Sequence, residues 1–253
     1  MARIFITGSS DGIGLHAAQM LAENGHKVTL HARNEDRAKT TRSAVPAAES
    51  VLIADLRSLA EIKQLAKDAN AIGTFDAIIH NAGIGYGSTS SREITSDGIS
   101  AVFAVNTLAP YILTCLMEKP RARILYMSSD SHYSGDASLK DCTQSHSYGN
   151  SKLHDVMLAK AFARRWQNVQ VISMHPGWVR TKMGGAAPGS AKTPAKALAQ
   201  WAVGDGPLSK VSSGAFVTTD GEESPHKGAG DESKQEELLV ICQNISGVSV
   251  AEQ

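Results

Sequence analysis

The sequence contains few cysteines, few aromatic residues and no excess of charge of either sign. Three cysteines stand among 253 residues, far apart and without a CxxC pair, so neither a disulfide framework nor a zinc site is indicated. The 25 Lys and Arg balance the 25 Asp and Glu, which removes the basic surface expected of a nucleic-acid binder or of a protein held on anionic lipid. We therefore expect a cytoplasmic protein with no nucleic-acid partner and no metal site.

Long hydrophobic runs are also scarce. The N-terminus carries only a short apolar run without a cleavage-site pattern, which indicates a buried strand rather than a signal peptide. Residues 98–117 are the one stretch that is long enough and uncharged enough to cross a bilayer. Asn106 and Pro110 interrupt it, and a central amide with a helix kink suits a helix buried against other protein. We expect no membrane partner.

Short apolar runs alternate with helical patterns along the whole chain, which is typical of βαβ units and a parallel sheet covered on both faces. Strands are expected over residues 4–7, 27–32, 50–54, 76–80, 123–127, 169–174 and 215–219. Helices are expected over residues 13–24, 34–43, 58–71, 98–117, 147–166, 193–203 and 231–245. No linker divides the pattern, so it predicts a single Rossmann-type, doubly wound α/β domain over 1–253, with a mainly parallel seven-stranded sheet and a C-terminal strand and helix in 204–253.

Two stretches rich in glycine and small polar residues interrupt this alternation. They cover residues 184–193 and 221–230, and neither has enough apolar content to contribute to a core. Both are therefore expected at the surface. The first, taken as 182–194, is a candidate lid over a substrate pocket.

A glycine-rich turn lies where the first strand passes into the first helix, and residues 7–14 read TGSSDGIG. Glycines there let the backbone approach a pyrophosphate, and the free N–H groups and positive dipole of the helix start bind its charge. No Gly-Lys-Ser/Thr follows, which excludes a P-loop. Such a turn alone is also compatible with a tight connection that binds nothing. The cofactor-binding residues predicted here are Gly8, Ser10, Asp11, Gly12, Ile13 and Gly14.

Tyr148 and Lys152 stand four residues apart, which places both side chains on one face of a helix. A free phenol has a pKa of about 10 and shuttles protons poorly at neutral pH. A neighbouring ammonium favours the phenolate and lowers that pKa. The spacing therefore predicts that Tyr148 is a usable general acid and base.

These motifs occur in an order that resembles the short-chain dehydrogenase/reductase family. The glycine turn is followed by Asn106, by the Ser-Ser pair at 128–129, by the Tyr-x-x-x-Lys pair and by Pro-Gly-Trp-Val-Arg-Thr at 176–181, and the likeness extends through about residue 183. The resemblance implies a nicotinamide cofactor laid across the carboxyl ends of the parallel strands. It also implies reversible hydride transfer between NADPH and a carbonyl, giving an alcohol. The short motifs look most like the carbonyl- and retinol-reductase-like branch.

The resemblance implies a role for each catalytic residue. Tyr148 donates a proton to the substrate oxygen, and Ser129, with Ser128 as the runner-up, hydrogen-bonds that oxygen. Lys152 lowers the pKa of the phenol and holds the nicotinamide ribose, while Asn106 anchors a water that relays protons to Lys152. Cofactor contacts are also implied for residues after the later strands: Asp55, Leu56, Asn81, Gly83, Tyr148, Lys152, Pro176, Gly177, Val179 and Thr181. Asp55 would meet the adenine amino group, or else cap the next helix, for which Ser58 is better placed.

The choice of cofactor depends on the end of the second strand. It reads His31-Ala32-Arg33-Asn34 and lacks the acidic residue that binds the ribose 2′-hydroxyl of NAD. A guanidinium binds a 2′-phosphate through two charge-assisted hydrogen bonds. We therefore predict NADP(H) as the cofactor and Arg33 as its ligand. The alternative is that Arg33 is a solvated surface residue, and Arg37 either assists it or faces water.

Two questions stay open at this point. One is whether the chain turns over a small-molecule carbonyl or alcohol, or is a non-catalytic NADP(H)-sensing regulator, which a pocket filled by Trp178 or by 182–194 would favour. The other is assembly, because a homodimer or homotetramer through the helices near 98–117 and 148–166 is possible, while their apolar faces also suit a cover for the sheet. The histidines near the site, His80, His132, His146 and His154, are expected to pack rather than to catalyse or bind metal.

Overall fold

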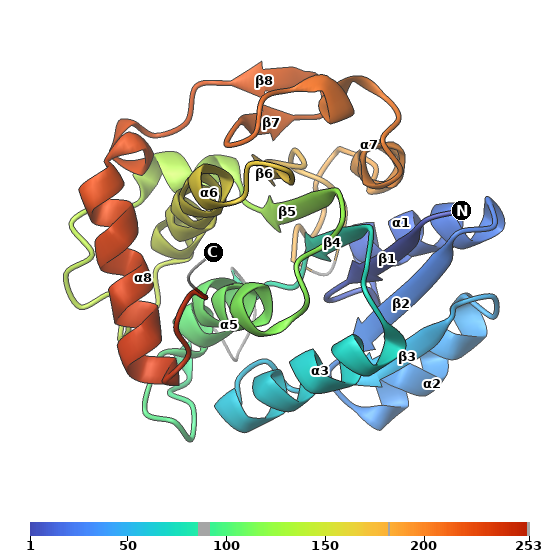
Figure 1. The fold of residues 1–253 in the computed structure, drawn as a ribbon, viewed down its shortest axis with the longest axis horizontal. Coiled ribbons are helices and arrows are strands. Elements are labelled where there is room, and N and C mark those ends of the chain that lie inside the picture. The colour runs from blue at the N-terminus through green and yellow to red at the C-terminus, as the bar shows by residue number, and fades with distance from the viewer. Residues whose placement is uncertain (86–91, 182, 252–253) are drawn as a thin grey trace.

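Eight strands form a single sheet in the order β3-β2-β1-β4-β5-β6-β7-β8 (Figure 1). The computed structural model describes residues 1–85, 92–181 and 183–251. Neighbouring strands are parallel from β3 to β7, which confirms the doubly wound α/β fold. The strands are β1 (Arg3–Ile6), β2 (Lys27–Ala32), β3 (Ser50–Ile53), β4 (Ala77–His80), β5 (Arg123–Met127), β6 (Gln170–Met174), β7 (Phe216–Thr218) and β8 (Gly221–Glu223).

The predicted count of seven strands is one too low. The additional strand, β8, lies in the glycine-rich stretch 221–230, which was expected at the surface and for which no strand was predicted. It pairs antiparallel with β7 at the edge of the sheet. Glu222 and Glu223 are exposed. An edge strand with no buried face needs no apolar alternation, so the hydrophobic pattern carried no signal for it.

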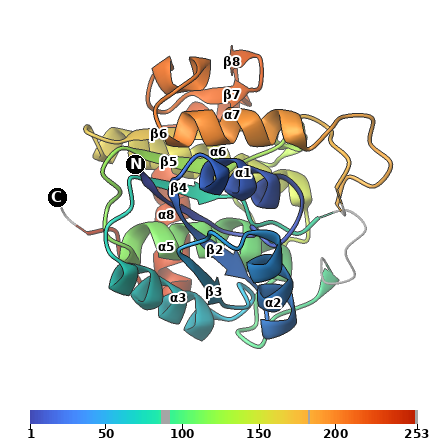
Figure 2. The same cartoon turned by 90° about the vertical axis from the view of Figure 1, so that its right-hand side faces the viewer.

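The helices form two layers around the sheet (Figure 2). The first core cluster joins the sheet to α3, α5, α6 and α8, and the second joins it to α1, α2 and α7. Along β1, Phe5 belongs to the first cluster and Ile4 and Ile6 to the second, as expected of a strand buried on both faces. The helices are α1 (Gly12–Glu23), α2 (Glu35–Ala44), α3 (Leu59–Ile72), α4 (Ala101–Phe103), α5 (Ala109–Leu116), α6 (Tyr148–Arg165), α7 (Lys192–Ala202) and α8 (Glu232–Ser246).

Local capping explains why these helices begin close to their predicted positions. The side chains of Asn34, Ser58 and Ser147 each accept a hydrogen bond from a backbone N–H in the first turn that follows. Ser58, rather than Asp55, therefore caps α3. This leaves the Asp55 carboxylate available for contacts at the end of β3.

The apolar stretch over 98–117 is a buried helical segment with a break in its geometry. It runs through α4, a π-helical turn η2 (Ala104–Leu108) and α5, and Pro110 lies in the first turn of α5. Asn106 lies within the π turn and is buried. Among the helices of the described residues, none has the length and apolarity needed to cross a membrane.

Candidate active site

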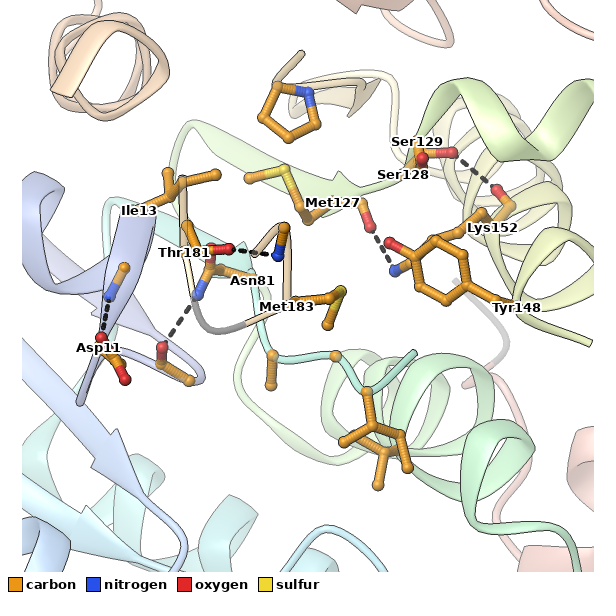
Figure 3. Close-up of a pocket in the computed structure, with 18 of the residues that line it drawn as sticks. Asp11, Ile13, Asn81, Met127, Ser128, Ser129, Tyr148, Lys152, Thr181 and Met183 are labelled. Carbon is orange, nitrogen blue, oxygen red and sulfur yellow. Dashed lines mark hydrogen bonds between the residues drawn. The ribbon is translucent and has the colours of Figure 1, made fainter. Parts of the chain in front are cut away.

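A cavity of about 570 Å³ opens at the carboxyl ends of the parallel strands. Figure 3 shows Asp11 and Ile13 of the glycine turn at one side of it, and Tyr148 and Lys152 of α6 at the other. Two residues predicted for the site, Gly14 and Asn106, do not line the cavity. The predicted residues that do line it are Gly8, Ser10, Asp11, Gly12, Ile13, Arg33, Asp55, Leu56, Asn81, Gly83, Ser129, Tyr148, Lys152, Pro176, Gly177, Val179 and Thr181.

The glycines of the turn permit close packing of the backbone. A Cβ on Gly14 would lie 2.5 Å from Nδ2 of Asn81, the amide that donates to the carbonyls of Thr7 and Gly8. Gly8 has a positive φ of +62°, and a Cβ there would lie 2.7 Å from Cα of Ala82. Gly14 therefore acts by bringing α1 against the residues that follow β4, rather than by forming the cavity wall.

His31 supports this turn at the cavity wall, a role that the sequence did not reveal. The Gly8 N–H donates to Nδ1 of His31 at 3.0 Å, and Nε2 lies 2.9 Å from the carbonyl oxygen of Ala54. Burial lowers the pKa of His31, so the ring is neutral, with Nδ1 as acceptor and Nε2–H as donor. A single histidine inside a strand gives no sign of such a bridge, because Gly8 and Ala54 come close to it only in the folded sheet.

Three arginines line the cavity close to the ends of β2 and β3. Arg33 is exposed at the cavity wall, and Nη1 of Arg37 donates to Oγ of Ser10 at 3.2 Å. Arg57 contacts the Asp55 carboxylate, with Nη2 and Oδ2 separated by 2.7 Å. Burial opposes the ionisation of Asp55, but hydrogen bonds from Arg57 outweigh it and lower the pKa of the carboxyl group. Arg57 was not predicted, and its position directly after Asp55-Leu56 was the available clue.

Tyr148 and Lys152 lie on one face of α6, as their spacing predicts. Nζ of Lys152 is 5.5 Å from the centroid of the Tyr148 ring. Lys152 lowers the pKa of the Tyr148 phenol, as predicted, and so does a hydrogen bond with Ser129. Burial raises this pKa by more, so the predicted net decrease is wrong. Spacing identified the cation but contained no information about burial.

The two candidate serines have different surroundings. Ser128 is buried, and its hydroxyl donates to the backbone carbonyl of Lys152 at 2.7 Å. Ser129 is partly exposed at the cavity wall, where its hydroxyl donates to Oδ1 of Asp130 at 2.9 Å. Ser128 therefore joins β5 to α6, and the Ser129 hydroxyl is the better placed of the two to meet a substrate.

Asn106 uses its side chain to hold the segment after β4. Its Oδ1 accepts from the N–H of Ile84 at 2.8 Å, and its Nδ2 donates to the Ile84 carbonyl and to Oγ of Ser151, each at 2.9 Å. This segment continues to Gly85, where a Cβ would lie 2.7 Å from Cδ2 of Tyr148. Gly85 thus lies against the ring of Tyr148, a contact that the sequence did not indicate.

The loop after β6 closes the cavity beside the glycine turn. A Cβ on Gly12 would lie 3.2 Å from Cγ2 of Thr181, which shows how closely the two segments approach. Trp178 lines the cavity but is 68% exposed, so it does not fill it. Within the predicted lid, Lys182 lies outside the described residues, Met183 and Gly184 line the cavity, and residues 192–194 belong instead to α7.

The histidines near the site have structural partners. His80 lies 3.0 Å from Oγ1 of Thr114, and burial lowers its pKa to about 3. His154 contacts Thr107, and His132 contacts the carbonyl of Ser129 and the N–H of His226. Across the described ranges, no group of three or more His, Cys, Asp or Glu side chains is arranged to hold a metal ion.

Comparisons with known proteins identify a family and a similar fold. The family model for short chain dehydrogenase matches residues 2–190. The chain is 68% identical over 252 residues to "Uncharacterized oxidoreductase AN7799" of Emericella nidulans, and 39% identical over 262 residues to "Short-chain dehydrogenase chry4" of Gibberella zeae; each alignment covers 99% of both chains. The solved structure of NADPH-bound carbonyl reductase from chicken fatty liver is similar with a TM-score of 0.69 and 25% identity, covering 89% of this chain and 99% of that one.

Proposed function

Because the chain belongs to the short-chain dehydrogenase family and is an oxidoreductase, we propose that it interconverts a small-molecule carbonyl and an alcohol with NADP(H) as cofactor. One observation carries the proposal. Ser129, Tyr148 and Lys152 line one wall of a cavity whose other walls are the glycine turn and the residues that end β2 and β3. A proton donor and a dinucleotide-sized cleft in one cavity suit hydride transfer.

The walls of the cavity fit an NADP(H) molecule. The glycine turn at the start of α1 suits the pyrophosphate, and the loop at 176–181 suits the nicotinamide amide. Arg33 and Arg37 suit a ribose 2′-phosphate, because no carboxylate ends β2 and both guanidinium groups line this side of the cavity. The similar carbonyl reductase from chicken fatty liver binds NADPH, which supports this choice. When bound, the cofactor supplies or accepts the hydride.

The side chains divide the remaining chemistry. The Tyr148 phenol donates a proton to the carbonyl oxygen, and the Ser129 hydroxyl donates a hydrogen bond to the same oxygen, where negative charge develops. The Lys152 ammonium stabilises the phenolate that Tyr148 leaves behind. Asn106 holds the backbone of Ile84 through two hydrogen bonds. The relay of protons through a water at Asn106 stays a prediction.

The proposal is tested by cofactor titration and by removal of one hydroxyl. Intrinsic fluorescence titrated with NADPH and NADH measures both affinities, and a carbonyl panel measures turnover. We expect tighter binding of NADPH, and a loss of turnover of about 100-fold or more in Tyr148→Phe with NADPH affinity retained. Tyr133→Phe is the matched control, because that exposed phenol donates to the Ser224 carbonyl instead.

Other outcomes of this experiment are equally informative. Binding of NADPH without turnover of any panel member would favour the non-catalytic NADP(H)-sensing regulator. Preference for NADH would show that the interpretation of Arg33 is wrong. Full turnover in Tyr148→Phe would remove the phenol from the mechanism.

The arrangement of α8 bears on assembly. This helix packs along α6, where Nη2 of Arg164 lies 2.8 Å from Oε1 of Glu236. Tyr111 of α5 donates to the carbonyl of Val248, just beyond α8, at 2.7 Å. The C-terminal segment therefore covers part of the surface through which a dimer or tetramer was expected. We propose that the chain does not associate through α5 and α6, and an intermolecular cross-link between these helices of two copies would contradict this.

A further inference from the structure

A buried carboxylate lies directly behind the candidate catalytic lysine. Asp155 follows Lys152 by three residues on α6, and its Oδ2 is 2.8 Å from Nζ of that lysine. The side chains are only 2% and 4% exposed, respectively. A buried charge is costly unless it is paired, and the contact with Lys152 offsets part of the free energy needed to remove this carboxylate from water.

Asp155 contacts the Lys152 ammonium from the side that faces away from the cavity. Nζ of Lys152 also donates to the carbonyl oxygen of Met127 at 2.7 Å (Figure 3), and the ring of Tyr148 lies in front of it. Lys152 lines the cavity, whereas Asp155 does not. Asp155 therefore acts on the reaction through Lys152 and touches none of the reacting atoms.

We propose that Asp155 is a positioning residue that holds the Lys152 ammonium in place and partly offsets its charge at Tyr148, so that the phenol stays protonated, and able to act as the proton donor of carbonyl reduction, to higher pH than it would beside Lys152 alone. This inference rests on the proposed function. Reduction requires the phenol as a proton donor, and oxidation requires the phenolate as an acceptor. A carboxylate behind the lysine favours the first state.

The charges around the phenol act in the directions that this role requires. Burial raises the pKa of Tyr148, Lys152 lowers it, and Asp155 raises it again. Burial also raises the pKa of Asp155 itself to about 7, although Lys152 opposes this. Against the effect of burial, Asp155 raises the pKa of Lys152. Asp155 is therefore ionised on the alkaline side of neutrality, which is the range in which loss of the phenol proton would limit reduction.

Neighbouring elements contribute few other ionisable groups. Tyr126 of β5 is buried, and its pKa is raised by burial and, to a smaller extent, by Asp155. His80 of β4 packs against Tyr126 and stays neutral, because burial lowers its pKa to about 3. Asp130, at the cavity wall, raises the pKa of Tyr148 slightly. Neither Tyr126 nor His80 carries a charge that replaces Asp155 at neutral pH.

The test is Asp155→Asn, which keeps the size of the side chain and an acceptor for Lys152 but removes the charge. We expect the alkaline limb of the pH profile for kcat/KM of carbonyl reduction to move down by about one pH unit. The direction holds whichever member of the Tyr148–Lys152 pair loses its proton first, because removing the carboxylate lowers the pKa of both. A purely structural role would lower kcat/KM at every pH without moving this limb.

A second readout does not depend on turnover. Tyrosinate absorbance across alkaline pH, with the curve of Tyr148→Phe subtracted, follows the titration of Tyr148 alone. We expect its midpoint to fall in Asp155→Asn and to stay unchanged in Asp68→Asn, where the carboxylate lies on α3 and bonds Gln64. An unchanged midpoint would overturn the inference, even if no carbonyl substrate is found and the proposed function fails.

If Asp155→Asn does not fold, the unmodified protein still tests whether the phenol is kept protonated against the charge of Lys152. In ¹³Cζ-tyrosine NMR, the Tyr148 signal is assigned by its loss in Tyr148→Phe. We expect its midpoint above the value of about 10 for a free phenol. A midpoint below that value would show that the charge of Lys152 outweighs burial and Asp155 together, so that Asp155 does not keep the phenol protonated as the inference requires.

Discussion

The two ends of the cavity hold ion pairs of nearly equal length in opposite surroundings. At the β3 end, Arg57 and Asp55 are 2.7 Å apart with side chains 37% and 26% exposed; at the α6 end, Lys152 and Asp155 are 2.8 Å apart with side chains 4% and 2% exposed. Distance alone would rank the pairs as equal. Exposed pairs typically contribute about 0–1 kcal/mol, whereas breaking a buried pair by removing one partner costs about 3–5 kcal/mol. The buried Lys152–Asp155 pair should therefore contribute more to the free energy of unfolding than the exposed Arg57–Asp55 pair.

The two ends also differ in how many basic side chains they present to the cavity. The β2 and β3 end presents Arg33, Arg37 and Arg57 to the cavity, so one guanidinium can compensate for another. The α6 end relies on Lys152, whose ammonium is held by Met127 and Asp155. We expect substitutions at the α6 end to have large effects on both folding and activity, and those at the arginine end to have graded effects on cofactor choice.

The largest effect is expected for Lys152→Met. This change leaves Asp155 buried without its cation, so at pH 9, where the carboxylate is ionised beside Lys152, the free energy of unfolding should fall by about 3–5 kcal/mol. Denaturant unfolding followed by circular dichroism measures it. The double variant Lys152→Met with Asp155→Leu removes both charges and should regain most of the lost stability. A single variant as stable as the parent would show that the pair does not matter to the fold.

Gly85→Ala should mainly affect the chemical step. The added Cβ would lie 2.7 Å from the ring of Tyr148, so the phenol has to move. We expect kcat for carbonyl reduction to fall about tenfold or more, because small displacements of a catalytic group are costly, with the Kd for NADPH nearly unchanged. Gly230→Ala is the matched control, since a Cβ there meets no atom within 4 Å. Equal kcat values in the two variants would place the Tyr148 ring away from the reaction.

Arg33→Ala should change cofactor choice rather than folding. Arg33 is exposed at the cavity wall, so its removal exposes no buried group. We expect the Kd for NADPH to rise about tenfold, the loss of one charge-assisted contact to a phosphate, while the Kd for NADH changes little. Fluorescence titration measures both. If the two constants rise together, the guanidinium holds a part of the cofactor that NADPH and NADH share.

The sequence predicted those parts of the fold and site that depend on local pattern. The glycine turn and the Tyr148–Lys152 pair lie where their spacing placed them, because each motif joins neighbouring residues of one strand end or one helix. The contacts of His31 and Gly85 were missed, since their partners come from distant parts of the chain. The sequence shows that Asp155 stands three residues after Lys152, but it does not show that the Asp155 side chain is buried. That burial results from the packing of the helices on the sheet, and it is the reason why the carboxylate affects Lys152 strongly.

Arg57→Gln should have the smallest effect of the four and tests the comparison most directly. Asp55 is partly exposed, so water replaces the lost guanidinium and the free energy of unfolding should fall by less than about 1 kcal/mol. Arg42→Gln, which removes an exposed pair with Glu35 on α2, is the control for loss of one surface cation. Because Arg33 and Arg37 remain, the Kd for NADPH should change by no more than about threefold. A loss of stability comparable with that of Lys152→Met would mean that proximity to the cavity, rather than burial, governs the strength of its ion pairs.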